Sequence, residues 1–417
     1  MTVGRGGPKA ATLAKLCRAG LPVPEGFCLA ADGYRAHLAA AGLEQVARRV
    51  ARANEREAGR LALEVRLGLL NAPLPAFLEE GLRTTAQRRS SELGPLVAVR
   101  SSALSEGARV ASFAGQLETI LGVASHADLV TAMRACWASL WSARAVRYMR
   151  AHGLDPARTA VAVLVQQQVE AQAAGGALSR TADGRLVLTA AWGLGPAVGQ
   201  GELVPDRYVL RHKGPVLERV EPGRKDRLLT CSREAGLRWQ AVAAESVNAP
   251  CLSEAEAVAL ARLVLTAEAV LSRPIEIEWA LDHRSFQILQ ARPLGKRPRR
   301  TGPQPRLGRL WLRGQPAGVG RAVGPARVVL TEGDLSRVRL GDVLVTKVPG
   351  PALSVALTRV AGVVAELGGS TSHLAALARE RGVPAVLGVP EATRLIADGS
   401  VVGVDGVEGV VCHQALR

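Results

Sequence analysis

The feature that most constrains the fold is a run rich in proline and arginine at residues 296–309, which reads KRPRRTGPQPRLGR. Proline has no amide hydrogen and cannot continue a helix or a central strand, so no regular element crosses this run. The chain of 417 residues is thereby divided. We predict a first domain at 1–293, a linker at 294–309 and a second domain at 310–417, each domain large enough for its own core.

Both predicted domains mix helical and strand patterns, which predicts an α/β (α+β) fold class. In the first domain a helix at 12–19 ends at the proline-containing stretch 20–24, and the expected strands are 96–101, 160–165, 185–189 and a hairpin of 275–280 with 286–291. In the second domain the expected strands are 322–330, 342–348, 361–366, 384–388 and 401–411. Helices are expected at 352–359 and 373–381.

The composition excludes several classes of protein. Hydrophobic residues make up 48% and charged residues 22%, which is typical of a globular chain. The most apolar window, 257–271, contains Arg262 and Glu268 and is shorter than the roughly 18 apolar residues of a membrane span, so we expect no membrane partner. The amino terminus lacks the apolar core of a secretory signal, which favours the cytoplasm. The six cysteines form no CxxC pair and are expected to be reduced thiols, mostly in the core.

The net charge of +16 raises the question of whether the chain binds nucleic acid. Only six of the 53 basic residues are lysine, which leaves 53 − 6 = 47 arginines, spread throughout the chain. Aromatic residues are only 3%, too few for the stacking platforms of single-strand binders. Nucleic acid is therefore not the expected partner, whereas phosphorylated small molecules fit the charge.

Two stretches of the first domain are suited to phosphate. Gly6, Gly7 and Pro8 bring Lys9 to the start of the predicted helix, where backbone amides and an ammonium group favour anions. Arg100 stands with two serines where a strand gives way to a loop, and the small residues of 112–116 would let the backbone approach a ligand. A flexible amino terminus and a structural ion pair of the arginine are the alternative interpretations.

The predicted hairpin carries side chains suited to a metal-bound triphosphate. Glu276 and Glu278 alternate with apolar residues, so both project from one strand face, and Gln290 and Arg292 likewise share a face of the next strand. Oxygen ligands suit magnesium, and a guanidinium suits phosphate. An ordinary solvated strand face would show the same alternation.

One histidine has a distinctive context. Residues 368–373 read GGSTSH and lead directly into the predicted helix at 373–381, so a serine or threonine caps this helix and His373 lies in its first turn. The positive end of the helix dipole favours the neutral imidazole, which is a competent nucleophile toward phosphorus. A histidine that merely fills a helix cap is the alternative.

These stretches resemble one family of enzymes. Residues 1–293 resemble the ATP-grasp nucleotide-binding domain shared by pyruvate phosphate dikinase, phosphoenolpyruvate synthase and rifamycin phosphotransferase. The matching segments are 8–13 (PKAATL), 20–27 (GLPVPEGF), 99–103 (VRSSA), 112–116 (SFAGQ), 192–195 (WGLG), 205–208 (PDRY), 277–280 (IEWA) and 288–293 (ILQARP). Residues 310–417 resemble the swivelling β/β/α phosphohistidine domain of the same enzymes, through 316–320 (PAGVG), 341–345 (GDVLV), 368–373 and 378–386 (ARERGVPAV).

The resemblance implies ATP and Mg²⁺ as cofactors and a set of site residues. It implies that His373 takes the β-phosphoryl group of ATP with release of AMP and, in the end, orthophosphate, and that Thr371 orients this histidine. The implied phosphate ligands are Lys9, Arg100 and Arg292, the last two with catalytic roles, and the implied magnesium ligands are Glu278 and Gln290. The other implied nucleotide-binding residues are Gly115, Gln116, Gln166 and Gln168, within the stretches 112–116 and 166–170. A swing of the second domain about the linker would then carry the phosphoryl group to an acceptor.

Four positions depart from the family pattern. Relatives usually carry an acid at the positions of Thr189 and Pro196, Arg180 replaces a small hydroxyl residue, and Pro8 interrupts the glycines before Lys9. None of these is an implied phosphate or metal ligand, so we expect ATP binding, while the effect on turnover stays open.

The acceptor is not identified by the sequence, because no segment resembles the acceptor domains of these enzymes. The favoured hypothesis is a two-domain ATP-dependent phosphotransferase whose small-molecule acceptor binds at the domain interface or is held by a partner protein. The second is the donor half of a split phosphoenolpyruvate synthase that needs a separate barrel protein. The third is a catalytically weak, nucleotide-responsive binding or scaffold protein. The absence of the usual acids at Thr189 and Pro196 is the feature that favours this hypothesis.

Overall fold

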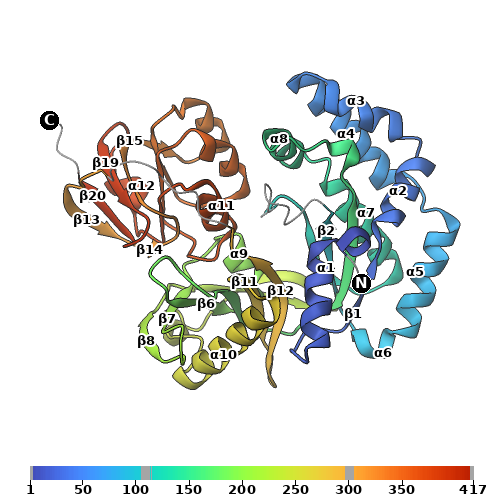
Figure 1. Ribbon diagram of the computed structural model, residues 1–417, viewed down its shortest axis with the longest axis horizontal. Coiled ribbons are helices and arrows are strands. Elements are labelled where there is room, and N and C mark those ends of the chain that lie inside the picture. The colour runs from blue at the N-terminus through green and yellow to red at the C-terminus, as the bar shows by residue number, and fades with distance from the viewer. Residues whose placement is uncertain (1–2, 105–112, 114, 296–304, 414–417) are drawn as a thin grey trace. The chain divides into compact units, whose positions relative to one another are not determined.

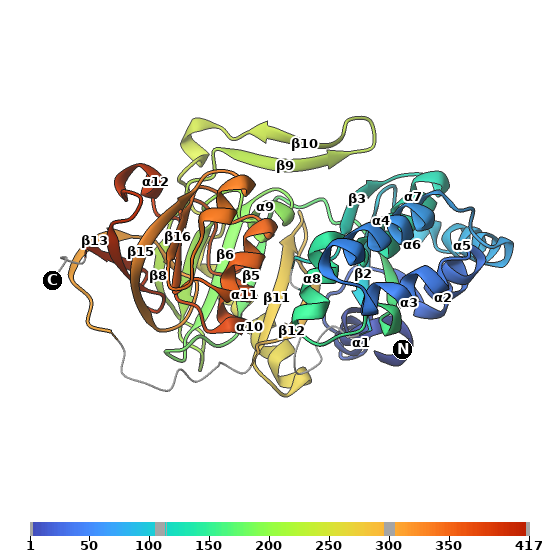
Figure 2. The same cartoon turned by 90° about the horizontal axis from the view of Figure 1, so that it is seen from above.

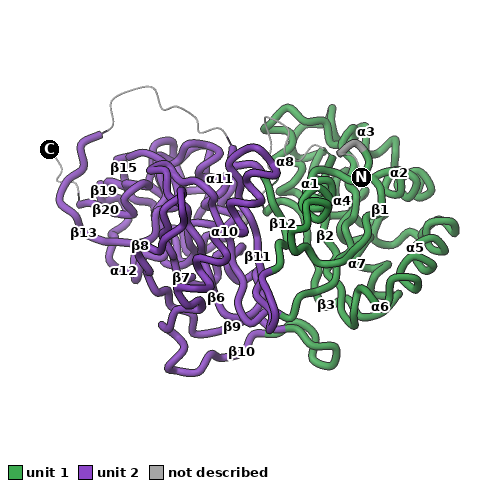
Figure 3. Tube along the Cα trace, turned by 60° about the horizontal axis from the view of Figure 1, so that its bottom comes forward, with its two compact units in different colours: residues 1–170, 231–238, 287–292 green, residues 171–230, 239–286, 293–417 purple. Residues whose placement is uncertain are grey.

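The computed structural model describes residues 3–104, 113, 115–295 and 305–413. Its internal contacts divide the chain into two compact units, coloured separately in Figure 3. Unit 1 comprises Met1–Glu170, Cys231–Arg238 and Gln287–Arg292, and unit 2 comprises Ala171–Thr230, Trp239–Phe286 and Pro293–Arg417. Most of the predicted linker, 296–304, lies outside the described residues. The domain boundaries at 293 and 310 remain a prediction.

Unit 1 contains a four-stranded antiparallel sheet in the order β1-β4-β2-β3. Two of its strands, β1 and β2, are labelled in Figure 1. Its strands are β1 (Gly26–Leu29), β2 (Val97–Ala103), β3 (Thr119–Val123) and β4 (Val161–Gln167). Its helices are α1 (Val3–Arg18), α2 (Ala31–Ala40), α3 (Glu44–Arg52), α4 (Glu55–Asn71), α5 (Ala76–Arg88), α6 (Ser90–Leu93), α7 (His126–Ser139) and α8 (Ala143–Ala151). Helices α1 and α2 contact β4, and α7 contacts β2, β3 and β4, so the strands predicted at 96–101 and 160–165 form a buried sheet.

Helix α1 begins earlier than the sequence predicts, because the glycines and Pro8 lie inside it. Gly7 has a left-handed backbone (φ 71°) that breaks the helix, and Pro8 starts the continuous part, a position where its missing amide hydrogen costs nothing. A Cβ at Gly7 would lie 2.7 Å from the carbonyl oxygen of Ser102. The glycine thus allows α1 to approach β2 closely, and Lys9 lies within the helix instead of before it.

A six-stranded sheet in the order β12-β11-β5-β6-β7-β8 forms the first part of unit 2, except that most of β12 belongs to unit 1. Its strands are β5 (Ala173–Leu178), β6 (Leu186–Trp192), β7 (Asp206–Leu210), β8 (Leu217–Glu221), β11 (Ile275–Leu281) and β12 (Phe286–Pro293). The predicted hairpin corresponds to β11 and β12. Strands β9 (Arg227–Ser232) and β10 (Gly236–Ala241) form a separate two-stranded ribbon (Figure 2). The short helix α9 (Pro196–Gly199) follows β6.

The most apolar window of the sequence lies in α10 (Glu254–Leu271), which contacts β6, β7, β8 and β11. Ser253 and Glu256 form a capping box at its start, and Ala257, Leu260 and Val264 are buried. Among the described residues no single helix is long and apolar enough to cross a membrane, although α4 and α5 together, bent by 59°, meet the criteria of length and composition.

The second part of unit 2 is an eight-stranded sheet in the order β13-β20-β19-β15-β16-β17-β18-β14. Its strands are β13 (Arg309–Arg313), β14 (Gln315–Pro316), β15 (Arg321–Val329), β16 (Val343–Thr346), β17 (Gly362–Ala365), β18 (Ala385–Leu387), β19 (Val401–Asp405) and β20 (Val410–His413). Strands β15 to β18 are parallel, with valines such as Val343, Val364 and Val386 fully buried between them. Helices α11 (His373–Arg381) and α12 (Ala392–Leu395) complete this part.

Two predicted elements of this part need correction. The strand predicted at 401–411 is two antiparallel strands, β19 and β20, because the chain turns at Gly406 and at Gly409, which has a left-handed backbone (φ 70°). The helix predicted at 352–359 is a 3₁₀ helix, Pro351–Thr358. The predicted α/β class is confirmed, and all six cysteines are free, with Cys136, Cys251 and Cys412 buried.

Candidate functional site

His373 is the first residue of α11, as the sequence predicts. Ser372 caps the helix, since its Oγ accepts a hydrogen bond of 3.3 Å from the backbone amide of Ala375. The imidazole is half-buried, and a Cβ placed on Gly199 would lie 3.4 Å from its Nε2. One ring nitrogen therefore faces the end of α9, in the glycine-rich stretch 193–201. A helix start presents unpaired amides, so an anionic group on this histidine would be stabilised there.

Thr371, the residue expected to orient His373, lies on the six-stranded sheet. Its Oγ1 is 2.5 Å from Oγ1 of Thr189 on β6, and both side chains are buried. Thr189 is paired in register with Gly176 on β5, and Gly176 with Glu278 on β11. Residues that face each other across antiparallel strands share a sheet face. The loop before His373 therefore lies on the sheet face that carries Glu278.

Two further residues, Arg379 and Gln315, hold this loop, and the sequence did not indicate their role. Arg379 on α11 pairs with Glu276 on β11 at 3.3 Å, and its other amino group donates to the carbonyl of Ser370. Gln315 donates from Nε2 to the carbonyl oxygen of Pro205 at 2.6 Å. The shared face of Glu276 and Glu278 was the only signal in the sequence that bears on these contacts.

The predicted phosphate ligands Lys9 and Arg100 lie in unit 1, near the break in α1. Lys9 donates from Nζ to the carbonyl oxygen of Ser101 at 2.8 Å, next to Arg100 in β2. Arg100 and Ser102 are two residues apart on β2, so their side chains share a face, and the close approach of Gly7 to Ser102 marks it as the face beside α1. The structure thus brings an ammonium group and a guanidinium to one side of the sheet.

Gly115 and Gln116 precede β3, whose Thr119 pairs with Arg100. Gly115 has a left-handed backbone (φ 65°), and Gln116 is almost fully buried. Arg144 donates to the backbone carbonyl of Gln116 at 3.2 Å. Ser112 and Ala114 of the predicted stretch lie outside the described residues.

Gln166 lies in β4 and Gln168 follows directly after it, and both are buried. Gln166 lies directly opposite Ala98 and therefore on the face that carries Arg100. Gln168 accepts a hydrogen bond of 2.6 Å from the backbone amide of Gly122, so its amide group also supports the fold.

The predicted magnesium ligands lie on the two strands of the hairpin, β11 and β12. Glu278 is on β11, and Gln290 and Arg292 are two residues apart on β12, all three half-buried. A carboxylate and an amide supply only oxygen ligands, which suit Mg²⁺ and leave positions for phosphate oxygens and water. The described residues contain no cluster of three His, Cys, Asp or Glu side chains that could hold a metal ion. Oxygen donors of this kind fit a magnesium ion whose remaining ligands are phosphate oxygens and water.

The four departures from the family pattern have local structural roles. Pro196 begins α9, and Pro8 begins the continuous part of α1. Arg180 pairs with Glu268 at 3.5 Å. Thr189 contacts Thr371, as described above.

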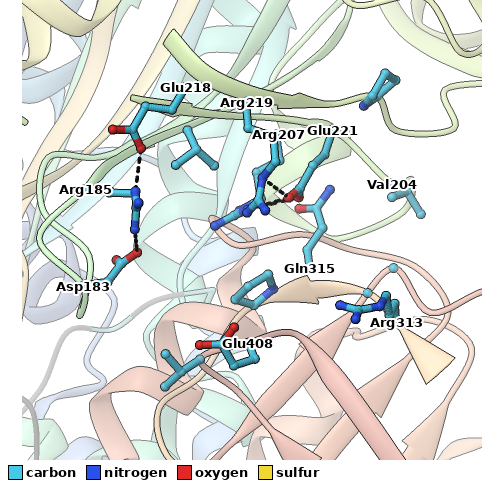
Figure 4. A pocket seen from close by; sticks show the side chains of 16 residues that line it. Asp183, Arg185, Val204, Arg207, Glu218, Arg219, Glu221, Arg313, Gln315 and Glu408 are labelled. Carbon is cyan, nitrogen blue, oxygen red and sulfur yellow. Dashed lines mark hydrogen bonds and ion pairs between the residues drawn. The ribbon is translucent and has the colours of Figure 1, made fainter. Parts of the chain in front are cut away.

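A cavity of about 660 Å³ in unit 2 lies where the eight-stranded sheet meets β7 and β8 (Figure 4). Its charged lining residues are Asp183, Arg185, Arg207, Glu218, Arg219, Glu221, Arg313 and Glu408. Several pair with one another, for example Arg207 with Glu221 at 3.0 Å and Arg185 with Glu218 at 2.6 Å. His373 is not among the residues that line it. The cavity therefore lies between the two sheets, and Gln315, which also contacts the loop before His373, is one of its lining residues.

Comparison with protein-family models finds two matches. The model described as pyruvate phosphate dikinase, AMP/ATP-binding domain, matches residues 4–306. The model described as PEP-utilising enzyme, mobile domain, matches residues 338–409. These matches agree with the predicted order of a nucleotide-binding domain followed by a histidine-bearing domain.

Curated relatives extend this similarity over nearly the whole chain. The chain is 32% identical over 462 residues to a phosphoenolpyruvate synthase of Aeropyrum pernix, covering 99% of this chain and 56% of that protein. It is 32% identical over 425 residues to a probable phosphoenolpyruvate synthase of Methanothermobacter thermautotrophicus, covering 98% and 61%. The chain thus spans between half and two thirds of the length of these relatives.

Proposed function

Because the chain belongs to the family of the pyruvate phosphate dikinase AMP/ATP-binding domain, we propose that it is an ATP-dependent phosphotransferase in which His373 carries the phosphoryl group. The observation that supports this most is the position of His373, at a capped helix start, in a loop packed on the sheet face that carries Glu278. The acceptor is an unidentified small molecule.

In the proposed reaction a nitrogen of the His373 imidazole forms a bond to the β-phosphorus of ATP. The bond from this phosphorus to the oxygen that it shares with the α-phosphorus breaks, and AMP leaves with that oxygen. Water then releases the γ-phosphoryl group as orthophosphate, which leaves one phosphoryl group on the histidine. This group passes to the acceptor and regenerates the free imidazole.

The residues around the triphosphate act by binding and by electrostatics. Lys9, Arg100 and Arg292 would hold the phosphates. Glu278 and Gln290 would hold Mg²⁺, which when bound neutralises charge on the phosphate oxygens. Thr371 would orient His373, and the amides at the start of α11 would stabilise the phosphorylated ring.

Radiolabelled ATP tests the proposal directly. With Mg²⁺ present, ATP labelled at its β-phosphorus should leave acid-labile label on the protein, while label at the α-phosphorus should appear in AMP and label at the γ-phosphorus in orthophosphate. ADP as the only nucleotide product, or no β-label on the protein, would contradict the proposal and favour the scaffold hypothesis.

Pyruvate is a second candidate for the acceptor, because the curated relatives are named phosphoenolpyruvate synthases and are longer than this chain. In this case the chain would be the donor half of a synthase whose barrel domain is a separate protein. Consumption of pyruvate that appears only when such a barrel protein is added would select this alternative. Pyruvate consumption by the chain alone would count against it.

Lys9→Met is expected to weaken binding of a non-hydrolysable ATP analogue by roughly ten- to a hundredfold, the effect of losing one hydrogen bond to a charged group. Calorimetric titration measures this change. Lys15→Met is the matched control, since Lys15 is an exposed lysine of the same helix, and its substitution should leave the affinity unchanged. Equal affinities of the two variants would remove Lys9 from the proposed phosphate site.

A further inference from the structure

Three polar side chains near His373 contact the first part of unit 2, namely the six-stranded sheet and the turn before β7. We call residues 368–373 the histidine loop. The three contacts join Thr371 to Thr189, Arg379 to Glu276, and Gln315 to the backbone of Pro205. The residues Thr189, Thr371, Glu276 and Gln315 are all buried, so these contacts are shielded from water. Polar groups buried in this way need hydrogen-bond partners in the protein, because they have lost their hydrogen bonds to water.

Two of these side chains also hold the backbone of the histidine loop. The amide of Ser370 donates to Oε1 of Gln315 at 3.4 Å, and the carbonyl of Ser370 accepts from Arg379. The same two side chains reach Pro205 and Glu276 at their other polar atoms. The conformation of the loop is therefore coupled to its contact with the sheet.

A glycine provides the space for this contact. A Cβ on Gly176 would lie 2.5 Å from Cβ of Thr371 and 2.6 Å from its Oγ1, and its three nearest heavy atoms all belong to Thr371. Gly176 is not among the residues with a positive φ, so its backbone conformation suits alanine. The amide of Gly176 also donates to Oγ1 of Thr189 at 3.2 Å, which fixes the hydroxyl that Thr371 meets.

We propose that Gly176, Thr189, Glu276 and Pro205 form a docking surface for the histidine-bearing domain of this chain, on which Thr189 positions Thr371 and thereby His373 to accept the phosphoryl group. This inference rests on the proposed function, but the contact itself does not require ATP. It gives Thr189, which departs from the family pattern, a role as a positioning residue. Glu278 is paired with Gly176, so docking places the histidine loop beside a proposed magnesium ligand.

A disulfide bond tests the docking surface without any chemistry on ATP. Thr189→Cys combined with Thr371→Cys replaces two hydroxyls in contact by two thiols, so mild oxidation should join them, as peptide mapping would show. Each single variant is a control for the native cysteines. The oxidised double variant should be held in the docked arrangement until it is reduced. Adding Gly176→Ala should reduce the yield of this disulfide, because the new methyl group occupies the position of Thr371.

The role of Thr189 is tested by the rate at which β-label reaches the protein from ATP. Thr189→Val removes the hydroxyl at nearly constant volume and should lower this rate roughly three- to tenfold, while Thr189→Ser keeps the hydroxyl and should retain it. Gly176→Ala should lower it more strongly. Affinity for the ATP analogue should stay unchanged in all three variants. A fault in folding alone would not distinguish serine from valine in this way.

The outcomes separate this proposal from the proposed function. Formation of the disulfide together with a labelling rate that follows the hydroxyl supports the docking surface. Normal labelling of the wild-type protein without formation of the disulfide, or equal rates for the valine and serine variants, overturns the docking surface and leaves the phosphotransferase proposal standing. The third outcome is that the disulfide forms in the double variant but the wild-type protein takes no β-label. This outcome supports the docking contact, but it overturns the role of Thr189 in phosphoryl transfer and contradicts the proposed function.

Discussion

Replacement of His373 by alanine is expected to abolish transfer of β-label from ATP to the protein while binding of the ATP analogue persists. The imidazole is the nucleophile of the proposed reaction, so its removal leaves no atom to form the bond to phosphorus. The proposed nucleotide ligands Lys9, Arg100 and Arg292 lie on other elements and are unaffected. Acid-labile radioactivity on the protein measures the first effect, and calorimetric titration with the analogue measures the second.

His413→Ala is the matched control for this variant. His413 is an exposed histidine at the end of β20, in the eight-stranded sheet of the same part of unit 2, where its ring packs on Trp311. Its substitution should leave labelling at the wild-type level. Retention of acid-labile label in the His373 variant, or its loss in both variants, would contradict the assignment of His373 as the phosphoryl carrier.

Local signals in the sequence were sufficient for the elements that carry the chemistry. The helix at 373–381 was predicted with the bounds that the structure has, because Ser372 caps its start and Gly382 ends it in a left-handed conformation (φ 68°). The strands β11 and β12 follow from alternation. Where the sequence was ambiguous, tertiary contacts decided the outcome. Gly7 breaks α1 by its left-handed backbone and allows β2 to approach closely, so the glycines do not form a free loop before the helix.

The contacts of the histidine loop could not be predicted, because they depend on how distant segments pack. Thr189 and Thr371 are 182 residues apart, and nothing in the residues between them indicates the contact. Thr189 could be identified only as a departure from a family pattern, with its effect on turnover left open. The structure adds the hydroxyl of Thr371 as its neighbour, which the sequence did not indicate.

The stretch PDRY at 205–208 illustrates how a matched motif can have a structural role. Asp206 and Lys225 form an ion pair of 2.5 Å with both side chains completely buried. The carboxylate also accepts hydrogen bonds from the backbone amides of Gly223 and Cys251, each at 2.8 Å. Burial and the negative charge of Asp206 raise the pKa of the Cys251 thiol, which keeps this cysteine neutral. The motif therefore fastens β7 to the segments that follow β8 and precede α10.

Asp206→Ala is accordingly expected to lower the free energy of unfolding by about 3–5 kcal/mol, the usual cost of breaking a buried ion pair from one side. The variant leaves two buried backbone amides without their acceptor and the ammonium group with the carbonyl of Gly223 but without a counter-charge. Lys225→Met should lower the free energy of unfolding by less, because the carboxylate keeps both amide donors. The double variant should lower it by less than the sum of the two single variants. Urea unfolding followed by tryptophan fluorescence measures these differences.

Glu391→Gln is the control for this series, since it breaks an ion pair with Arg394 in which both side chains are mostly exposed. Exposed pairs contribute little because water and salt screen them, so its midpoint of unfolding should stay close to that of the wild type. Asp206→Asn, which keeps the shape of the side chain and one acceptor oxygen, gives a measurable variant if the alanine variant does not fold. Stabilities of the two Asp206 variants as close to the wild type as that of the control would show that this buried pair does not hold the sheet together.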